Sequence, residues 1–282
     1  MPGRSSACAL VAFIAVAACG QRDAPQADPA AEEPFAPVVE PVLVQVDAGS
    51  VAAPDTVAPG WRLVRVEEDG AGHIPVIFLM QDSASTFDAS AFLRELDEGV
   101  DTPGHALALG GPEVGDSGEV FIRFTPGRYL LACVIRGEDG HRHAVAGEAR
   151  MFVVPDVPPA AGADAPPGAS YLVRMIDFAY MGPEDWEAGQ QVLRVDNAGQ
   201  QDHQVRIARL KAGSTMRDWL HAEEPNDHAT NIAGVARMGS GVVAYLPVDL
   251  PPGEYVIYCL VPDKDSGKPH VMLGMLRAIH VK

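Results

Sequence analysis

A thiol, an imidazole and a thioether lie close together near the C-terminal end of this 282-residue chain. They belong to Cys259, His270 and Met275, in the stretch that follows the turn Pro252-Gly253. From Glu254 to Leu260 the chain alternates into aromatic and β-branched residues, which predicts a strand that is at least half buried and ends at the cysteine. Soft and borderline ligands of these kinds select copper or zinc over magnesium or calcium.

This order of ligand types resembles the cupredoxin family, in which an upstream His is followed by Cys, His and Met on a closing loop. The H-x4-M spacing from His270 to Met275 matches that family. The resemblance implies that His203, which starts a run after the turn Asp196–Gly199, is the upstream ligand. It also implies one copper ion, held by His203, Cys259 and His270 with Met275 as the axial ligand, and an electron route through the His270 edge.

The stretch between Cys259 and His270 is longer than in most of that family, with ten residues where a few are usual. The cost of closing a loop grows only logarithmically, by about 0.6 kcal/mol for each doubling of length. We therefore expect residues 263–268 to bulge outward as a turn between Pro262 and Pro269.

The chain contains an internal repeat. Residues 41–70 align with residues 170–199 at a shift of 129, and the motif Pro-Gly-x-Tyr-x3-Cys at residues 126–133 recurs at residues 252–259. Proline and glycine at fixed offsets place turns at fixed positions. Short strands with closely spaced turns are typical of a β-sandwich, so we predict an all-β fold of two tandem cupredoxin-like Greek-key sandwiches. Each copy also contains one short predicted helix, at residues 88–96 and 214–221.

In the first copy the repeat places His73, Cys133 and His143 at the positions of the second copy's ligands, but Glu148 stands where the second copy has Met275. A carboxylate is a hard ligand and favours a non-blue metal site or none. This set is a possible second metal site, to which His141 could add a further imidazole.

The two cysteines of the mature chain allow other interpretations. In an exported protein a Cys133–Cys259 disulfide is possible, although equivalent positions in two folding units are expected to lie too far apart. Alternatively both are buried thiols, and the histidines belong to turns of a metal-free binding or scaffold module.

Enzymatic chemistry has little support in the sequence. No G-x-S-x-G, P-loop or H-E-x-x-H motif is present. Copper oxidases and reductases that resemble this fold have a His beside the ligand cysteine, whereas Cys259 is flanked by Tyr258 and Leu260. The acidic stretch HAEEPNDH, residues 221–228, could chelate a surface cation but is more typical of a solvated loop.

Residues 1–19 have the pattern of a bacterial lipoprotein signal, with Arg4, a short apolar run and the sequence VAAC. This pattern predicts lipidation of Cys19 and attachment of the mature chain to the membrane. By resemblance to the sorting of bacterial lipoproteins, Gly20 in place of an Asp after the cysteine implies the outer membrane, with the protein facing the periplasm. An ordinary signal peptide that contains a cysteine is the alternative.

The remaining composition sets the predicted domain plan. Residues 20–40 read as a disordered tether rich in Pro, Ala and acidic residues, and residues 156–169 as a linker between the predicted domains 41–155 and 170–282. The formal net charge is −17 with 21 Lys and Arg, so a nucleic-acid partner is not expected. We expect a lipid-anchored protein that binds copper for electron transfer or copper handling, with a possible redox partner protein.

Overall fold

The computed structural model describes residues 40–282 apart from positions 69, 71, 82–87, 105 and 114–116. The chain divides into the units Met1–Pro34 and Phe35–Lys282, and every described residue belongs to the second unit. The predicted signal at residues 1–19, with Cys19, and the predicted tether up to residue 39 lie outside the described residues. Where the chain is described, no helix has the length and apolar character needed to cross a bilayer.

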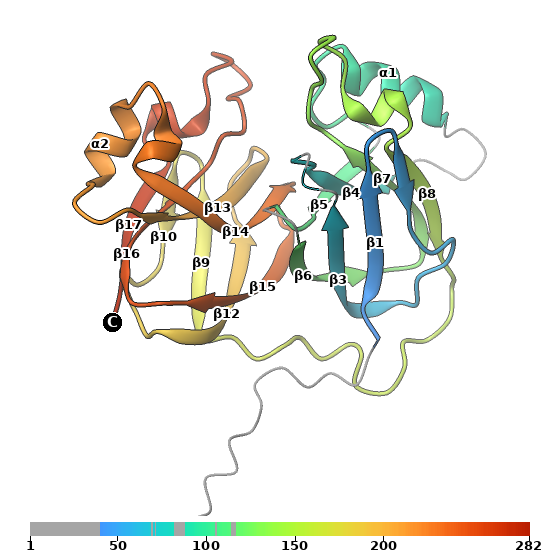
Figure 1. The fold of residues 1–282 in the computed structure, drawn as a ribbon. Coiled ribbons are helices and arrows are strands. Elements are labelled where there is room, and N and C mark those ends of the chain that lie inside the picture. Colours follow the sequence, from blue (N-terminus) through green and yellow to red (C-terminus); the bar gives the residue numbers. More distant parts are fainter. Residues whose placement is uncertain (1–39, 69, 71, 82–87, 105, 114–116) are drawn as a thin grey trace, which may run out of the picture. The chain divides into compact units, whose positions relative to one another are not determined.

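The first half of the described chain consists of short strands, with a helix between the fourth and fifth of them (Figure 1). The elements are β1 (Val42–Asp47), β2 (Ser50–Ala52), β3 (Gly60–Glu68), β4 (Pro75–Met80), α1 (Ala89–Asp97), β5 (Ala106–Gly110), β6 (Ser117–Phe124), β7 (Gly127–Cys133), the 3-10 turn η1 (His143–Ala146) and β8 (Ala149–Val154).

The second half repeats this plan. Its elements are β9 (Tyr171–Ile176), β10 (Ala179–Met181), β11 (Asp185–Trp186), β12 (Gly189–Asn197), β13 (His203–Leu210), α2 (Met216–His221), η2 (Pro225–Asp227), β14 (Ala229–Met238), β15 (Val243–Leu250), β16 (Gly253–Tyr258), η3 (His270–Leu273) and β17 (Leu276–Val281).

The strands form two sheets, and each sheet runs through both halves of the chain. One has the order β10-β9-β12-β15-β6-β3-β1-β2 and the other the order β11-β17-β16-β13-β14-β5-β4-β7-β8. The halves meet where β15 pairs with β6 and where β14 pairs with β5, both antiparallel (Figure 1). The predicted domains are therefore joined edge to edge by backbone hydrogen bonds as well as by the segment 156–169.

Alternation of side chains explains why these segments form strands. In β3, Val64 and Val66 point into the core while Arg65 and Glu67 on the other face are more exposed, which is the period of two that a half-buried strand requires. One large cluster of buried apolar side chains includes Val64 and Val120 of the first half and Val195 and Ile257 of the second. The prediction of an all-β fold with two tandem sandwiches is confirmed.

The repeated Pro-Gly-x-Tyr motif has a structural role that we did not derive from the sequence. The hydroxyl of Tyr129 donates to the carbonyl of Thr125 at 2.7 Å, and the hydroxyl of Tyr255 donates to the carbonyl of Pro251 at 2.6 Å. Both rings are buried, so each hydroxyl needs a partner and finds it in the turn that precedes its own strand. The motif thereby sets where β7 and β16 begin.

Both predicted helices are present and begin at capped residues. Asp88 accepts the N–H groups of Ser90 and Ala91 at the start of α1. At the start of α2, Thr215 and Asp218 form a reciprocal capping box. The prediction of one short helix in each half is confirmed.

Candidate metal centre

The second half brings three predicted ligands to one end of a sheet. His203 is the first residue of β13, and Cys259 directly follows β16, which runs antiparallel to β13. The start of one strand therefore lies beside the end of the other. His270 begins η3, where its N–H donates to the carbonyl of Val261 at 2.9 Å.

The three ligand atoms point at a common focus. The Nδ1 atoms of His203 and His270 are 3.0 Å apart, and the Nδ1 of His270 is 3.5 Å from the Sγ of Cys259. All three side chains are completely buried, and their ligand atoms lie within 4.8 Å of one another. A tetrahedral ion with metal bonds of about 2.0 to 2.3 Å places its ligand atoms roughly 3.3 to 3.6 Å apart.

Met275 lies next to the cysteine through the backbone. The N–H of Cys259 donates to the carbonyl of Met275 at 3.3 Å, and the N–H of Met275 donates to the carbonyl of His270 at 2.9 Å. The Met275 side chain is fully buried. These bonds hold the cysteine, the second histidine and the methionine in one compact backbone unit.

The long loop closes as predicted. Pro262 and Pro269 form an isolated antiparallel bridge, and the N–H of Asp263 donates to the carbonyl of Lys268 at 2.9 Å. Residues 263–268 thus form an outward turn whose two ends are pinned together. The loop length does not prevent the imidazole of His270 from reaching the thiol of Cys259.

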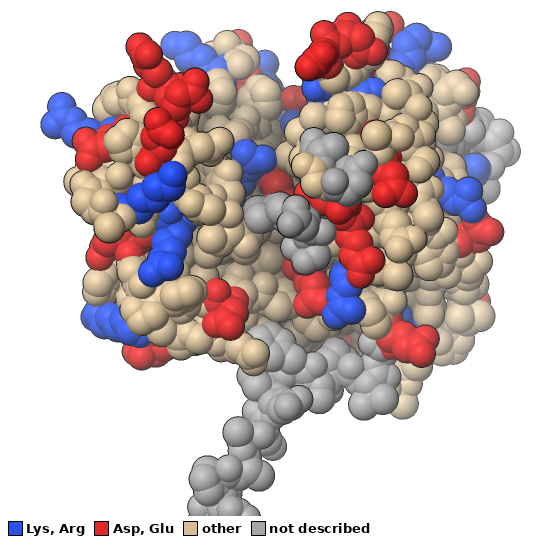
Figure 2. Space-filling view, in the orientation of Figure 1, with Lys and Arg blue, Asp and Glu red and all other residues tan. Residues whose placement is uncertain are grey.

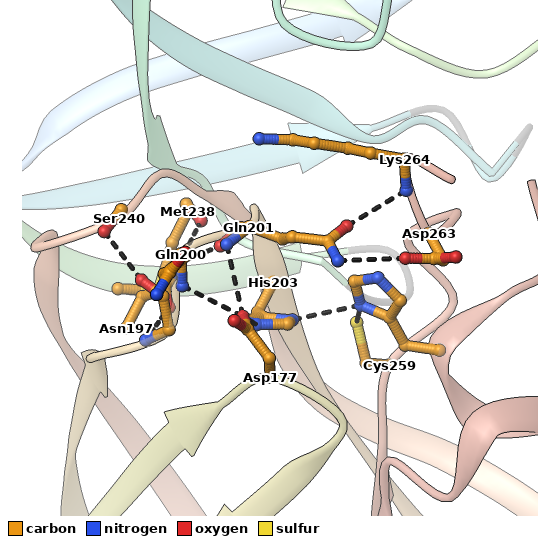
Figure 3. A network of polar contacts seen from close by, with 12 residues as sticks. Asp177, Asn197, Gln200, Gln201, His203, Met238, Ser240, Cys259, Asp263 and Lys264 are labelled. Atoms are coloured by element: carbon orange, nitrogen blue, oxygen red, sulfur yellow. Dashed lines mark hydrogen bonds and ion pairs between the residues drawn. The ribbon is translucent and has the colours of Figure 1, made fainter. Parts of the chain in front are cut away.

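Asp177 orients the ring of His203 (Figure 3). Its Oδ1 lies 3.0 Å from the Nε2 of His203 and also accepts the backbone N–H groups of Gln200 and Gln201. Because a carboxylate only accepts, Nε2 carries the proton and the lone pair of Nδ1 points at the focus. A Cβ on Gly199 would lie 2.5 Å from Asp177 Oδ1 and 2.6 Å from that Nε2, so a larger residue here would displace the Asp177–His203 pair.

Gln201 connects this turn to the long loop. Its side-chain amide donates to Asp263 Oδ1 at 2.9 Å, and its carbonyl oxygen accepts the N–H of Lys264 at 3.0 Å (Figure 3). The pKa of Asp263 is lowered to about 2 by hydrogen bonds from Ser266 and Gln201. This clamp ties the loop before His270 to the turn before His203.

Burial controls the protonation of the candidate ligands. Burial and the neighbouring His203 lower the pKa of His270 to about 4, and burial also lowers the pKa of His203, although Asp177 opposes that shift. Burial raises the pKa of the Cys259 thiol to about 12. At neutral pH both imidazoles are neutral ligands, and a metal has to displace one proton from the thiol.

The His270 ring, through which the family resemblance implies the electron route, is covered by other side chains. The ring is fully buried, its Nε2 has no hydrogen-bond partner among the described residues, and the ring of Phe178 meets it edge-on with centroids 5.2 Å apart. Phe178 has φ of 65°, the only positive value at a non-glycine residue in the described part of the chain. Residues other than glycine rarely adopt a positive φ. Here this backbone conformation places the aromatic ring of Phe178 against the second imidazole.

The first half contains the equivalent group. The Sγ of Cys133 is 3.8 Å from the Nδ1 atoms of both His73 and His143, which are 3.4 Å apart. The N–H of Cys133 donates to the carbonyl of Glu148 at 2.9 Å, as that of Cys259 does to Met275. The register inferred from the repeat is thus confirmed, with Glu148 in the position of Met275.

Other predicted candidates lie apart from these two groups. His141 is exposed and its Nδ1 is 2.7 Å from Asp97 Oδ2. His228 of the acidic stretch bonds the hydroxyl of Ser214. Cys133 and Cys259 are both unpaired and buried, so the possible disulfide between them is absent.

Sequence reasoning missed Asp177, Phe178 and Gln201. Asp177 lies 26 residues before His203 in the turn between β9 and β10, and no motif spacing connects the two. Gly199 was noted as a repeated turn residue, but its close approach to the His203 ring had no signal in the sequence.

Comparisons with known proteins give likeness of structure alone. No model of a protein family matches the chain, and no curated protein matches its sequence. Among solved structures, dithionite-reduced auracyanin from Roseiflexus castenholzii is similar with 21% identity over 41% of this chain and 99% of its own, at a TM-score of 0.30.

Two larger structures are similar over most of the chain. A copper-containing nitrite reductase from Thermus scotoductus shares 14% identity over 86% of this chain and 61% of its own, at a TM-score of 0.24. A blue copper oxidase from Nitrosomonas europaea shares 13% identity over 84% and 76%, at a TM-score of 0.23.

Proposed function

We propose that the second half binds one copper ion at His203, Cys259 and His270, with Met275 beside them as a weak ligand. The convergence of two Nδ1 atoms and one Sγ within a buried focus carries this proposal. Two imidazoles with a thiolate and a thioether are the ligand set that holds copper in either oxidation state. Copper bound there would supply one-electron chemistry, and the chain would hold it in place.

The fit of the residues to copper rests on three features. Asp177 leaves the lone pair of His203 Nδ1 at the focus. The Nδ1 of His270 is the ring nitrogen at the focus, 3.0 Å from the Nδ1 of His203 and 3.5 Å from the Sγ of Cys259. The backbone bonds among Cys259, His270 and Met275 hold the ligands before any ion arrives, so little rearrangement is needed on binding.

We propose electron transfer or copper handling rather than catalysis as the role of this site. In the described chain the ligand groups place no further imidazole next to Cys259, whose neighbours are Tyr258 and Leu260. The buried, closed ligand set leaves little room for a substrate at the metal. We propose the His270 edge as the electron route, with the half-buried ring of Phe178 as its cover.

Attachment and partners remain part of the proposal. The lipoprotein-like sequence at residues 1–19 supports a lipid anchor at Cys19 and a place on the periplasmic side of the outer membrane. Figure 2 shows Asp and Glu side chains spread over the face drawn, with Lys and Arg interspersed. With a net charge of −17, the chain favours a redox partner with a basic docking face.

The test is visible absorption of the full-length chain after addition of one equivalent of Cu²⁺. We expect an intense copper–thiolate band that persists in Cys133→Ser and is lost in Cys259→Ser. Metal content measured on the same samples shows whether copper is bound. If wild-type protein binds no copper and develops no band, the chain is a metal-free binding module instead.

A further inference from the structure

The first half has a ligand group whose chemistry differs from that of the second. It consists of His73, Cys133, His143 and Glu148, whose ligand atoms lie within 4.8 Å of one another. The Oε2 of Glu148 is 2.7 Å from the Nδ1 of His73 and 3.3 Å from the Nδ1 of His143. In the metal-free protein this oxygen accepts a hydrogen bond from His73, and it lies beside both nitrogens where an ion would be bound.

The surrounding backbone fixes this carboxylate. The N–H of Gly49, in the turn between β1 and β2, donates to Glu148 Oε1 at 2.9 Å. A Cβ on Gly147 would lie 2.4 Å from the carbonyl oxygen of Gly49, so the turn and the end of η1 approach closely only because position 147 is glycine. With Oε1 held, Oε2 points at the thiol and the imidazoles.

The spacing of the four atoms suits one four-coordinate ion. The nitrogen–nitrogen distance of 3.4 Å and the two sulfur–nitrogen distances of 3.8 Å are close to the roughly 3.3 to 3.6 Å expected around a tetrahedral ion. The 2.7 Å contact between Glu148 Oε2 and His73 Nδ1 is a hydrogen bond of the metal-free protein, which an ion would replace by taking the place of its proton. His73, Cys133 and Glu148 are buried and His143 is partly buried. Two nitrogens, one sulfur and one oxygen fill the coordination shell and leave no open position.

Charge balance separates this group from the second one. A thiolate and a carboxylate together carry two negative charges, so a divalent ion makes the buried group neutral. In the second half the thiolate is the single negative ligand. The group is therefore neutral with a monovalent ion and has a net charge of one positive unit with a divalent ion. Because an uncompensated buried charge is costly, the first group favours an ion that stays divalent.

We propose that the first half holds a redox-inert divalent ion of the zinc class at His73, Cys133, His143 and Glu148. The first sandwich would then hold an ion that stays divalent, and the second sandwich a copper ion that changes oxidation state. This proposal goes beyond the proposed copper site and does not depend on it. A metal-free alternative is a proton shared in the His73–Glu148 pair, which the experiment below distinguishes.

The first experiment removes the second group and probes the remaining one. The full-length chain with Cys259→Ser is stripped of metal and titrated with Co²⁺, whose thiolate bond absorbs in the near ultraviolet. We expect one equivalent bound with such a band, displaced by one equivalent of Zn²⁺, and both lost when Cys133→Ser is added. A Cys259→Ser protein that binds neither ion would overturn the proposal.

The second experiment exchanges the distinguishing ligands. Glu148→Met is expected to weaken Zn²⁺ binding at least 10-fold and to let the first group develop a copper–thiolate band of its own, whereas Glu148→Gln weakens Zn²⁺ binding without that band. The matched variant Met275→Glu should weaken the copper band of the second half. Circular dichroism establishes that each variant is folded. Unchanged Zn²⁺ affinity in folded Glu148→Gln would show that the carboxylate is no ligand.

Discussion

Asp177 is far from the predicted ligands in the sequence, yet it determines which ring nitrogen of His203 faces the thiol. A histidine without such a partner can place its proton on either ring nitrogen. Here one carboxylate oxygen accepts from His203 Nε2 and from two backbone N–H groups. The acceptor lone pair at the focus is therefore a property of the turn between β9 and β10, and not of the histidine alone.

The buried histidines make the metal-free protein sensitive to acid. Burial and His203 lower the pKa of His270 to about 4 in the folded protein, against about 6.5 in an unfolded chain. The unfolded state binds more protons between these values. Above about pH 6.5 the protonation of His270 therefore does not reduce the free energy of unfolding. As the pH drops to 4, the free energy of unfolding falls by up to about 3 kcal/mol.

Urea denaturation of the metal-free chain at several pH values measures this loss. In His270→Gln the residue cannot titrate, so its stability should fall less steeply over the same pH range. Parallel curves for the two proteins would contradict the assignment of the effect to His270.

At the scale of elements, the turn between β9 and β10 contributes both Asp177 and Phe178, one on each imidazole. The positive φ of Phe178 is an outlier that the surrounding contacts have to maintain. It places the ring against His270, which in turn has no exposed surface. One short turn thus orients the first imidazole and covers the second.

Replacing Phe178 with Ala should open the path to His270. We expect the copper–thiolate band to be unchanged, because no ligand is altered, while the reduced protein is oxidised faster by a small cationic complex. A cation is the better probe because the chain has a net charge of −17. Stopped-flow absorption follows the reaction, and Phe92→Ala in the separate core beneath α1 is the control. Equal rates in wild type and Phe178→Ala would show that this ring does not limit access.

Local patterns allowed much of the fold and the ligand set to be predicted from the sequence. Cys259, His270 and Met275 follow one another within a single strand–loop–strand segment, and the turn at residues 263–268 is enclosed by two prolines. The role of His203 as a ligand was implied by the family resemblance, together with the turn that precedes it. The turns and strands themselves were predicted from neighbouring residues.

What could not be predicted depends on contacts between distant segments. The bond from Asp177 to His203, the cover of Phe178 over His270 and the pairing of β6 with β15 join residues that share no motif. Strand edges in particular have no local signature, because their hydrogen bonds involve the backbone alone.

At the scale of the whole molecule, a buried carboxylate links the two halves. Glu113 lies between β5 and β6 of the first half, and its side chain accepts from Gln204 at 2.9 Å and from Arg206 at 2.6 Å, both on β13. Its backbone N–H also donates to the carbonyl of Gly234 on β14. The strand that begins with His203 is thereby fastened to the other sandwich.

Loss of this carboxylate should destabilise both halves together. Glu113→Ala leaves the largely buried Arg206 without its charge partner, which costs about 3 to 5 kcal/mol in comparable cases. Glu113→Gln keeps hydrogen-bonding atoms and should lose less. Urea denaturation followed by tryptophan fluorescence and by circular dichroism should give one coincident transition for the wild type, and two separated transitions would show that the halves unfold independently.

Sheets that continue from one repeat into the other also protect the chain from aggregation with other copies of itself. A single sandwich would leave β6 and β5, or β15 and β14, as edge strands with unpaired backbone N–H and C=O groups. Such edges pair with strands from other molecules. Each repeat thus acts as the other's cover against aggregation. A duplicated chain of this design has reason to keep both copies even if the two come to hold different ions.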